Sequence, residues 1–239
     1  MQIDVIMLIS GLDEEALERR RQSLSSLASP GTEIRLVLTE NAPPSVESFA
    51  EMELAAPGIL KRVVTSEREG ADAVVIGGCH DPSLTAAREL VSVPVLGPGM
   101  ASIHIASALA EKFSLLVQLP HVIGIARRQI RDLGFQDRCA GIYSVGLSVL
   151  ELGKPENFER VRKTAVASIE EGGADAICFG CMGLNDQAAP LAEELRKSHP
   201  GVLVIHPGRA VIRLAELLVG MGLSHSKRSY PFPPKEVRF

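Results

Sequence analysis

Two short segments of this chain are near copies of each other, and they constrain its fold more than any other feature. Residues 70–82 read GADAVVIGGCHDP, and residues 173–183 read GADAICFGCMG. Each segment begins with Gly-Ala-Asp-Ala, continues with an apolar run of strand length, and ends in a glycine-containing turn that carries a cysteine, Cys79 or Cys181. A strand and turn that occur twice predict two similar structural units.

Further segments repeat in the same order in the two halves of the chain. The pairs are IDVIMLIS (3–10) with FSLLVQLP (113–120), the fainter PSVES (44–48) with YSVGLSVLEL (143–152), and VLGPGMASI (95–103) with VIHPGRAVI (204–212). Any α/β chain repeats apolar strands and glycine turns, but this does not account for both the cysteine turns and the Pro-Gly-x-Ala pairs. We therefore interpret the chain as an internal duplication.

Apolar runs of strand length alternate with amphipathic stretches along the chain. The predicted strands are 2–9, 33–39, 73–77, 93–96, 113–119, 140–145, 175–179 and 202–205. The predicted helices are 13–28, 45–54, 83–91, 100–112, 121–133, 156–171, 187–198 and 208–221. Continuous apolar strands separated by helices indicate an α/β fold with parallel sheets covered on both faces. We expect two similar lobes related by pseudo-two-fold symmetry, 1–96 plus 207–239 and 97–206, with the active site in the cleft between them.

The bulk composition excludes several classes of partner. The 239 residues are 46% hydrophobic and 23% charged, as in an ordinary soluble globular protein. The net charge of −4 includes no basic block, so neither nucleic acid nor an acidic membrane surface is expected as a partner. No apolar run approaches the ~20 residues that span a bilayer. The opening MQIDVIMLIS reads as a strand rather than an export signal, and 4 cysteines are too few for a disulfide framework, so a reducing, cytoplasmic location is expected.

Cys79 and Cys181 are the strongest candidates for catalytic residues. Ligands of open parallel sheets bind beyond the carboxyl ends of the strands, where both cysteines are expected. Asp81 is expected to cap the helix after Cys79, with Pro82 at its first position. A thiol beside a helix amino terminus has a lowered pKa, so that thiolate is available near neutral pH. The alternative of buried structural thiols is common for a lone cysteine, but two matched turns count against it.

The other cysteines and histidines give weaker signals. CFGC (178–181) has C-x-x-C spacing, but Cys178 lies within the apolar run and is expected to point into its lobe, which disfavours a redox or zinc role. Cys139 is expected to be an ordinary core thiol. His206 ends a strand in the second Pro-Gly segment, where it either faces the cleft or serves as a structural histidine; the structural role is favoured.

Two opposed thiols suit one kind of chemistry. A small molecule held between the lobes would present one carbon to a thiol on each face. One thiolate would remove a proton while the opposite thiol delivers another, which inverts the centre. Backbone N–H groups of the glycine-rich turns would stabilise the anion formed. The sequence has neither a Walker motif nor a dinucleotide G-x-G-x-x-G motif, and we expect no cofactor and no metal.

Longer motifs carry a family resemblance: GGCHDPSLTAAREL, KFSLLVQLP, DRCAGIYSVGLSVLEL, GADAICFGCMGL and LLVGMGLSHSKRSYPFPPK. Together they resemble the aspartate/glutamate/hydantoin racemase superfamily over nearly the whole chain, most closely its hydantoin racemase branch. The resemblance implies two α/β lobes and cofactor-independent two-base racemisation at the lobe interface, with Cys79 and Cys181 as the acid/base pair. The residues that it implies for substrate binding are Ser10, Pro44, Ser45, Gly78, His80, Gln118, Leu119, Met182 and Gly183.

The chain departs from the family pattern where relatives hold polar ends of their substrates. Ser10-Gly11-Leu12 replaces an Asn-Pro-Asn type turn, and Gln118-Leu119 replaces a Thr-Thr pair. His80 stands where hydantoin relatives often have an aromatic residue, and His206 where an Asp often stands. Racemisation of a 5-substituted hydantoin or a related amino-acid derivative is the expected reaction. The alternatives are an Asp/Glu-type amino-acid racemase, a related carbanion isomerase or decarboxylase, and a two-lobed small-molecule binding protein.

A small-molecule substrate is the expected partner. The sequence is also compatible with a homo-oligomer, because the apolar, Pro-rich tail YPFPPKEVRF (230–239) is suited to packing on a neighbouring lobe or subunit.

Overall fold

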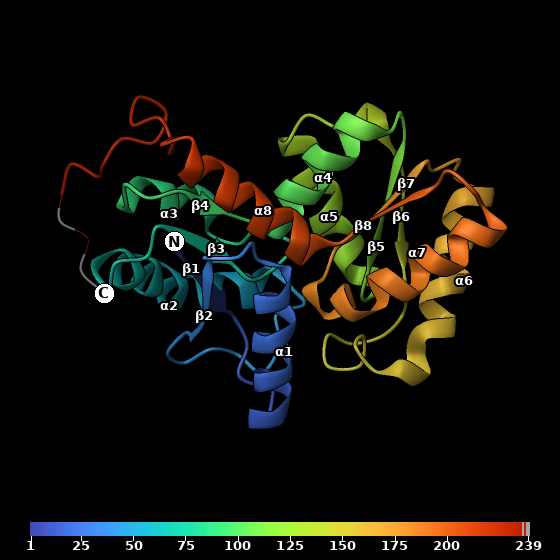
Figure 1. The fold of residues 1–239 in the computed structure, drawn as a ribbon, viewed down its shortest axis with the longest axis horizontal. Coiled ribbons are helices and arrows are strands. Elements are labelled where there is room, and N and C mark those ends of the chain that lie inside the picture. Colours follow the sequence, from blue (N-terminus) through green and yellow to red (C-terminus); the bar gives the residue numbers. More distant parts are fainter. Residues whose placement is uncertain (236, 238–239) are drawn as a thin grey trace. The chain divides into compact units, whose positions relative to one another are not determined.

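The computed structural model describes residues 1–235 and 237, in which strands and helices alternate (Figure 1). The strands are β1 (Gln2–Met7), β2 (Glu33–Leu38), β3 (Ala73–Ile76), β4 (Val95–Leu96), β5 (Phe113–Val117), β6 (Cys139–Ser144), β7 (Ala176–Phe179) and β8 (Leu203–Ile205). The α-helices are α1 (Glu14–Leu27), α2 (Phe49–Arg68), α3 (Leu84–Leu90), α4 (Pro98–Leu109), α5 (Ile123–Asp132), α6 (Phe158–Glu170), α7 (Ala188–Ser198) and α8 (Pro207–Gly220). Short 3-10 helices are η1 (Pro120–Val122), η2 (Gln136–Arg138), η3 (Pro155–Asn157) and η4 (Met182–Gln187). The α/β fold class predicted from the sequence is confirmed.

The strands form two parallel sheets of the same topology. The first sheet has the order β2-β1-β3-β4, and the second has the order β6-β5-β7-β8. All pairings within them are parallel. The strands that precede the two cysteine turns, β3 and β7, therefore occupy the same place in their sheets. The matched strand order confirms the two similar units that the sequence repeats predict.

Each sheet has an apolar core of its own. The first core contains Ile6 of β1 and Val74 and Ile76 of β3, packed with buried residues of α2 and α3. The second core contains Ile177 and Phe179 of β7, packed with buried residues of α6 and α7. In both strands the core residues are two positions apart, as expected for side chains on one face of a sheet. Each sheet is thus stabilised by helices of its own half of the repeat.

The chain divides into two compact units, here called the first and second lobes. The first lobe comprises Met1–Pro98 with the described residues from Val211 onward, and the second comprises Gly99–Ala210. The chain passes from the first lobe to the second in the first turn of α4, and it returns to the first lobe in the first turn of α8. Both helices begin with Pro-Gly. Proline is favoured there because the first N–H groups of a helix have no partner within it. The boundaries expected from the sequence remain a prediction.

Within the described residues, no helix is both long and apolar enough to span a membrane.

The largest difference from the sequence prediction is the length of α2. The sequence predicts a helix at 45–54, whereas α2 continues to Arg68. Pro57 removes a backbone hydrogen bond and Gly58 has low helix propensity, so both suggest an earlier end. The buried positions of α2 keep the helical period across them: Ala55, Ile59, Val63 and Ser66. A Cβ at Gly58 would lie 2.9 Å from the Glu40 carbonyl oxygen, so close packing explains this glycine.

The segment after α8 packs on α3 and β4 of the first lobe. Lys227 Nζ donates a hydrogen bond to the Arg88 carbonyl oxygen at 2.7 Å, near the end of α3. The Val95 N–H donates to Nε2 of His225 at 2.7 Å. The Arg88 guanidinium also donates to the Tyr230 hydroxyl at 3.3 Å. The start of the Pro-rich tail therefore contacts its own lobe, and part of the remainder lies outside the described residues.

His225 is expected to make the folded protein sensitive to mild acid. Burial, with a smaller contribution from the charge of Arg88, lowers the pKa of His225 from 6.5 to about 4. Between pH 6.5 and about pH 4, the unfolded chain therefore binds more protons than the folded chain. The stability that the neutral His225 gives the folded protein is complete above pH 6.5 and is lost as the pH falls toward about 4. In urea unfolding at about pH 7 and about pH 5, His225→Asn should lose less stability on acidification than wild type.

His121, which is exposed, provides the matched control for this experiment. His121→Asn should keep the pH dependence of the wild type. If His225→Asn loses as much stability as wild type between the two pH values, His225 is not the titrating group.

Candidate active site

The first cysteine turn follows β3 directly. The Gly77 N–H donates to the carbonyl oxygen of Ile6 in β1 at 2.9 Å, which extends the sheet pairing beyond the strand. A Cβ at Gly77 would lie 2.6 Å from that same oxygen, so the position accepts only glycine. Cys79 lies just beyond it and is 3% exposed. The first candidate catalytic thiol is thus held at the carboxyl edge of its sheet.

The second cysteine turn repeats these contacts after β7. The Gly180 N–H donates to the carbonyl oxygen of Leu116 in β5 at 2.7 Å, and a Cβ at Gly180 would lie 3.2 Å from that oxygen. Cys181 is 9% exposed and is the N-cap of η4, with its Sγ accepting a hydrogen bond from the Gly183 N–H at 3.4 Å. A thiolate accepts such a bond more strongly than a thiol does.

Asp81 does not cap the helix after Cys79, contrary to the sequence prediction. The N-cap of α3 is Ser83, which makes no side-chain capping bond, and Pro82 lies before the helix. Asp81 and Ser83 both have positive φ, 52° and 60°. This turn brings the Asp81 carboxylate against Gly97, where an added Cβ would lie 2.0 Å from Oδ1. The expected cap and first position of this helix are therefore wrong, because α3 begins at Leu84.

The other two cysteines are not suited to proton transfer. Cys178 lies between two core residues of β7, so its side chain is on the opposite face, where its thiol donates to the Ser102 carbonyl oxygen at 3.7 Å. Burial raises the pKa of Cys178 far above its ordinary range, and burial also raises the pKa of Cys139. None of the cysteines forms a disulfide in the described chain, and no group of three or more potential metal ligands occurs there. The expectation that Cys178 points into its lobe agrees with this geometry.

The substrate-contacting residues expected in the first lobe lie on loops at the carboxyl ends of β1, β2 and β3. These residues are Ser10, Pro44, Ser45, Gly78 and His80. The Ser10 hydroxyl donates to the Ala42 carbonyl oxygen at 2.9 Å, which joins the loop after β1 to the loop after β2. The Gly78 N–H donates to the Ile76 carbonyl oxygen at 2.8 Å. The Gly78 N–H is thus engaged inside the turn.

The residues expected in the second lobe follow β5 and β7. They are Gln118, Leu119, Met182 and Gly183. The Gln118 carbonyl oxygen accepts from the Gly146 N–H at 2.8 Å, so the loops after β5 and β6 are joined much as those after β1 and β2 are. The Gly183 N–H is engaged with the Cys181 sulfur. In each lobe, the structure therefore gathers the expected residues at one edge of the sheet.

The segment 145–154, after β6, contacts the Cys181 turn, although it is not among the substrate-binding residues expected from the sequence. A Cβ at Gly183 would lie 3.2 Å from the Val149 carbonyl oxygen. The side-chain amide of Gln187, in η4, donates to the Leu152 carbonyl oxygen at 3.3 Å. In the sequence, only the faint repeat that pairs this segment with the loop of Pro44 and Ser45 indicates a place beside the cysteine turn. The loop after β6 therefore packs against the Cys181 turn.

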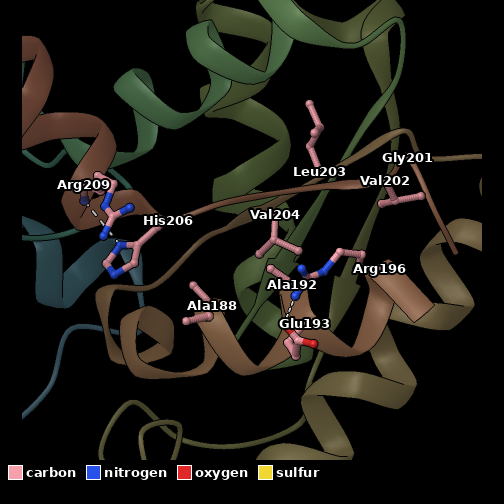
Figure 2. A pocket seen from close by; sticks show the side chains of 11 residues that line it. Ala188, Ala192, Glu193, Arg196, Gly201, Val202, Leu203, Val204, His206 and Arg209 are labelled. Carbon is pink, nitrogen blue, oxygen red and sulfur yellow. Dashed lines mark hydrogen bonds and ion pairs between the residues drawn. The ribbon is translucent and has the colours of Figure 1, made fainter. Parts of the chain in front are cut away.

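His206 has a structural role at the start of α8. Figure 2 shows His206 and Arg209 at one end of a surface groove along α7 and β8. The Arg209 N–H donates to Nδ1 of His206 at 3.3 Å. Burial, followed by the charge of Arg209, lowers the pKa of His206, which favours the neutral ring that accepts this bond. The groove is lined by Ala188, Ala189, Ala192, Glu193, Arg196, Gly201, Val202, Leu203, Val204, His206 and Arg209.

Two parallel-sheet lobes of one topology, each with a cysteine turn after the equivalent strand, define the class of this protein. The chain belongs to the Asp/Glu/Hydantoin racemase family, whose profile matches residues 14–215, and it is a racemase of small molecules. It is 35% identical to the hydantoin racemase of Pseudomonas sp. (strain NS671) over 88% of this chain and 84% of that protein.

Solved structures of relatives support the same assignment. An allantoin racemase from Klebsiella pneumoniae is 33% identical, with a TM-score of 0.88 over 98% of this chain and 94% of that one. An allantoin racemase from Pseudomonas fluorescens is 30% identical, with a TM-score of 0.88 over 100% of both chains.

Proposed function

We propose that this protein racemises a small cyclic ureide, either a 5-substituted hydantoin or allantoin, by inverting the substituted ring carbon. Relatives named hydantoin racemase and allantoin racemase, each at least 30% identical to this chain, support this substrate class. In both ring systems the reacting C–H lies between a carbonyl group and a ring nitrogen. Its proton is acidic because the carbanion formed is delocalised as an enolate.

Cys79 and Cys181 are the proposed acid and base. The thiolate of one cysteine takes the ring proton, and the electron pair of the C–H bond moves into the enolate. The thiol of the other cysteine then delivers its proton to the opposite face. The first cysteine ends as a thiol and the second as a thiolate, which is the state required for the opposite enantiomer. Proton exchange with water returns the pair to its starting state.

The observation that carries this proposal is the equivalence of the two turns. Gly77 and Gly180 make the same backbone hydrogen bond to the neighbouring strand, and each is followed closely by a cysteine. A racemase must serve two mirror-image substrates, so two similar half-sites with one thiol each match the reaction. The remaining cysteines lie outside the matched turns, and burial raises their pKa values, so we assign them no part in the proton transfers.

The surrounding residues are proposed to hold the ring. In the first lobe they are Ser10, Pro44, Ser45, Gly78 and His80, and in the second they are Gln118, Leu119, Met182 and Gly183. Because the thiols account for both proton transfers, we propose that no metal or organic cofactor takes part. A cytoplasmic location fits this chemistry, since a reducing compartment keeps both thiols reduced. The lobes proposed to enclose the substrate are 1–96 plus 207–239 and 97–206.

A substrate screen tests the proposal. Enantiopure 5-substituted hydantoins, allantoin, aspartate and glutamate are incubated separately with the protein, and optical rotation is followed. Rotation should decay for a hydantoin or allantoin and persist for both amino acids. Dialysis against EDTA should leave the rate unchanged, whereas iodoacetamide should abolish it, with substrate protecting. Inversion of the amino acids alone, or a loss on dialysis that zinc restores, would contradict the proposal.

A further inference from the structure

The orientation of Cys181 depends on the 3-10 helix that follows it. The Leu184 N–H donates to the Cys181 carbonyl oxygen at 3.1 Å, and the Gly183 N–H donates to the Cys181 sulfur at 3.4 Å. Both bonds join Cys181 to η4. The orientation of the thiol therefore depends in part on how η4 is held in the lobe.

Asn185 attaches η4 to the start of α8. Asn185 is 6% exposed, and its Oδ1 accepts a hydrogen bond from the Gly208 N–H at 3.2 Å. The two residues are 23 positions apart in the chain, so this bond is a tertiary contact rather than a feature of a local turn. Leaving a buried polar group without a partner costs roughly 1–3 kcal/mol. The pairing of Asn185 with Gly208 is therefore a strong restraint on η4.

The hydrogen bonds at the amino end of α8 explain why this partner is needed. The first N–H groups of a helix have no acceptor within it. Pro207 has no N–H, and the two N–H groups that follow Gly208 go to His206, one to Nδ1 at 3.3 Å and one to the carbonyl oxygen at 2.9 Å. The Gly208 N–H is satisfied by Asn185. Asn185 thus completes the cap of α8 and joins that helix to the cysteine turn.

In the first lobe, a side chain that follows the cysteine also lies beside the start of the Pro-Gly helix. In the Pro-Gly repeat, Gly97 stands where His206 stands in the second lobe. Asp81 follows Cys79 and places its carboxylate in the space that a Gly97 side chain would take. In both lobes, a side-chain oxygen from just after the cysteine reaches the start of the Pro-Gly helix.

We infer that Asn185 is a positioning residue for Cys181. It acts through η4, which it holds against the start of α8. Without its oxygen, the Gly208 N–H loses its partner, η4 shifts, and the Cys181 sulfur leaves the position required for proton transfer. Cys79 belongs to the other turn and is unaffected. This inference rests on the proposed function, since the effect is measured as the share of Cys181 in the reaction.

The test compares Asn185→Leu in two backgrounds that each retain one candidate thiol. In Cys79→Ala only Cys181 can exchange the ring hydrogen with deuterated buffer, and in Cys181→Ala only Cys79 can do so. Asn185→Leu should slow exchange by about 10–100-fold in the Cys79→Ala background and by less than about 2-fold in the Cys181→Ala background. Asn185→Asp keeps an oxygen at the same place and should restore exchange in the first background.

The outcomes separate this inference from the proposed function. Equal losses in the two backgrounds, or no loss in either, overturn the positioning role and leave racemisation standing. If wild type exchanges neither a hydantoin nor allantoin, the proposed function fails and the positioning role fails with it. Thermal unfolding reports whether each variant is folded. If Asn185→Leu does not fold, Asn185→Ala makes the same comparison with the same expected result.

Discussion

Replacing Cys79 with alanine should lower the rate of racemisation by about 10²–10⁴-fold, and replacing Cys181 should do the same, since each change removes one of the two groups that transfer protons. The surviving thiolate can still take a proton from the enantiomer that faces it and return deuterium to the same face. In deuterated buffer, each variant should therefore exchange the ring hydrogen of one enantiomer only, and the two variants should prefer opposite hands. Chiral chromatography with mass detection measures both quantities.

Cys139→Ser is the matched control for these variants. Cys139 is a half-buried thiol whose pKa is raised by burial, so it should contribute nothing to proton transfer. This control should racemise within about 2-fold of wild type. The two-thiol mechanism fails if either Cys79→Ala or Cys181→Ala racemises near the wild-type rate, or if both exchange the same hand.

Gly77→Ala is expected to have the largest effect on stability. The new Cβ would lie 2.6 Å from the Ile6 carbonyl oxygen, a backbone atom that cannot move without breaking the sheet. The strand must shift, and the hydrogen bond from Gly77 to Ile6 is lost with it. Overpacking together with the lost bond should reduce the free energy of unfolding by about 2–4 kcal/mol. Urea unfolding followed by circular dichroism measures this loss.

Two further glycines test the steric explanation. At Gly180 the nearest atom to an added Cβ is Val117 Cγ1 at 2.8 Å, a side chain that can give way, so Gly180→Ala should cost less than Gly77→Ala. Gly124 lies in α5 with nothing within 4 Å of an added Cβ, and Gly124→Ala should be neutral or stabilising by up to about 1 kcal/mol. If Gly77→Ala and Gly124→Ala change the free energy of unfolding equally, the contact of the new Cβ with Ile6 does not determine stability.

The sequence predicts the elements of this fold well because most strands lie in largely apolar runs and amphipathic stretches separate them. The error in α2 shows the limit of that approach. Pro57 and Gly58 are helix-breaking signals in isolation, and the packing that overrides them involves a buried stripe that continues to Ser66. Gly58 is required by the approach of the Glu40 backbone, a contact that no local pattern reveals.

The candidate site is predictable from the sequence as far as its repeats extend. The cysteine turns and the Pro-Gly helix starts can be predicted because each occurs twice in the sequence. The structure places the turns after β3 and β7 and the Pro-Gly segments at the starts of α4 and α8. The tertiary hydrogen bonds that hold the Cys181 turn cannot be predicted from the sequence. Asn185 contacts a residue 23 positions away, and Gln187 contacts Leu152, 35 positions away. Asp81 misled the prediction because its two-residue spacing from Cys79 suggested a local cap, whereas its carboxylate lies against Gly97.

The division of the chain into lobes has a consequence for the order in which the protein is made. The second lobe is one uninterrupted segment, Gly99–Ala210, so all of its parts have left the ribosome soon after α7 and β8 are synthesised. The first lobe is completed later, because Glu216 of α8 accepts a hydrogen bond from Ser29 and Lys227 donates one to Arg88 near the end of α3. Its sheet is translated first but is completed last. The amino-terminal half of the nascent chain therefore remains incomplete while the whole of the second lobe is synthesised.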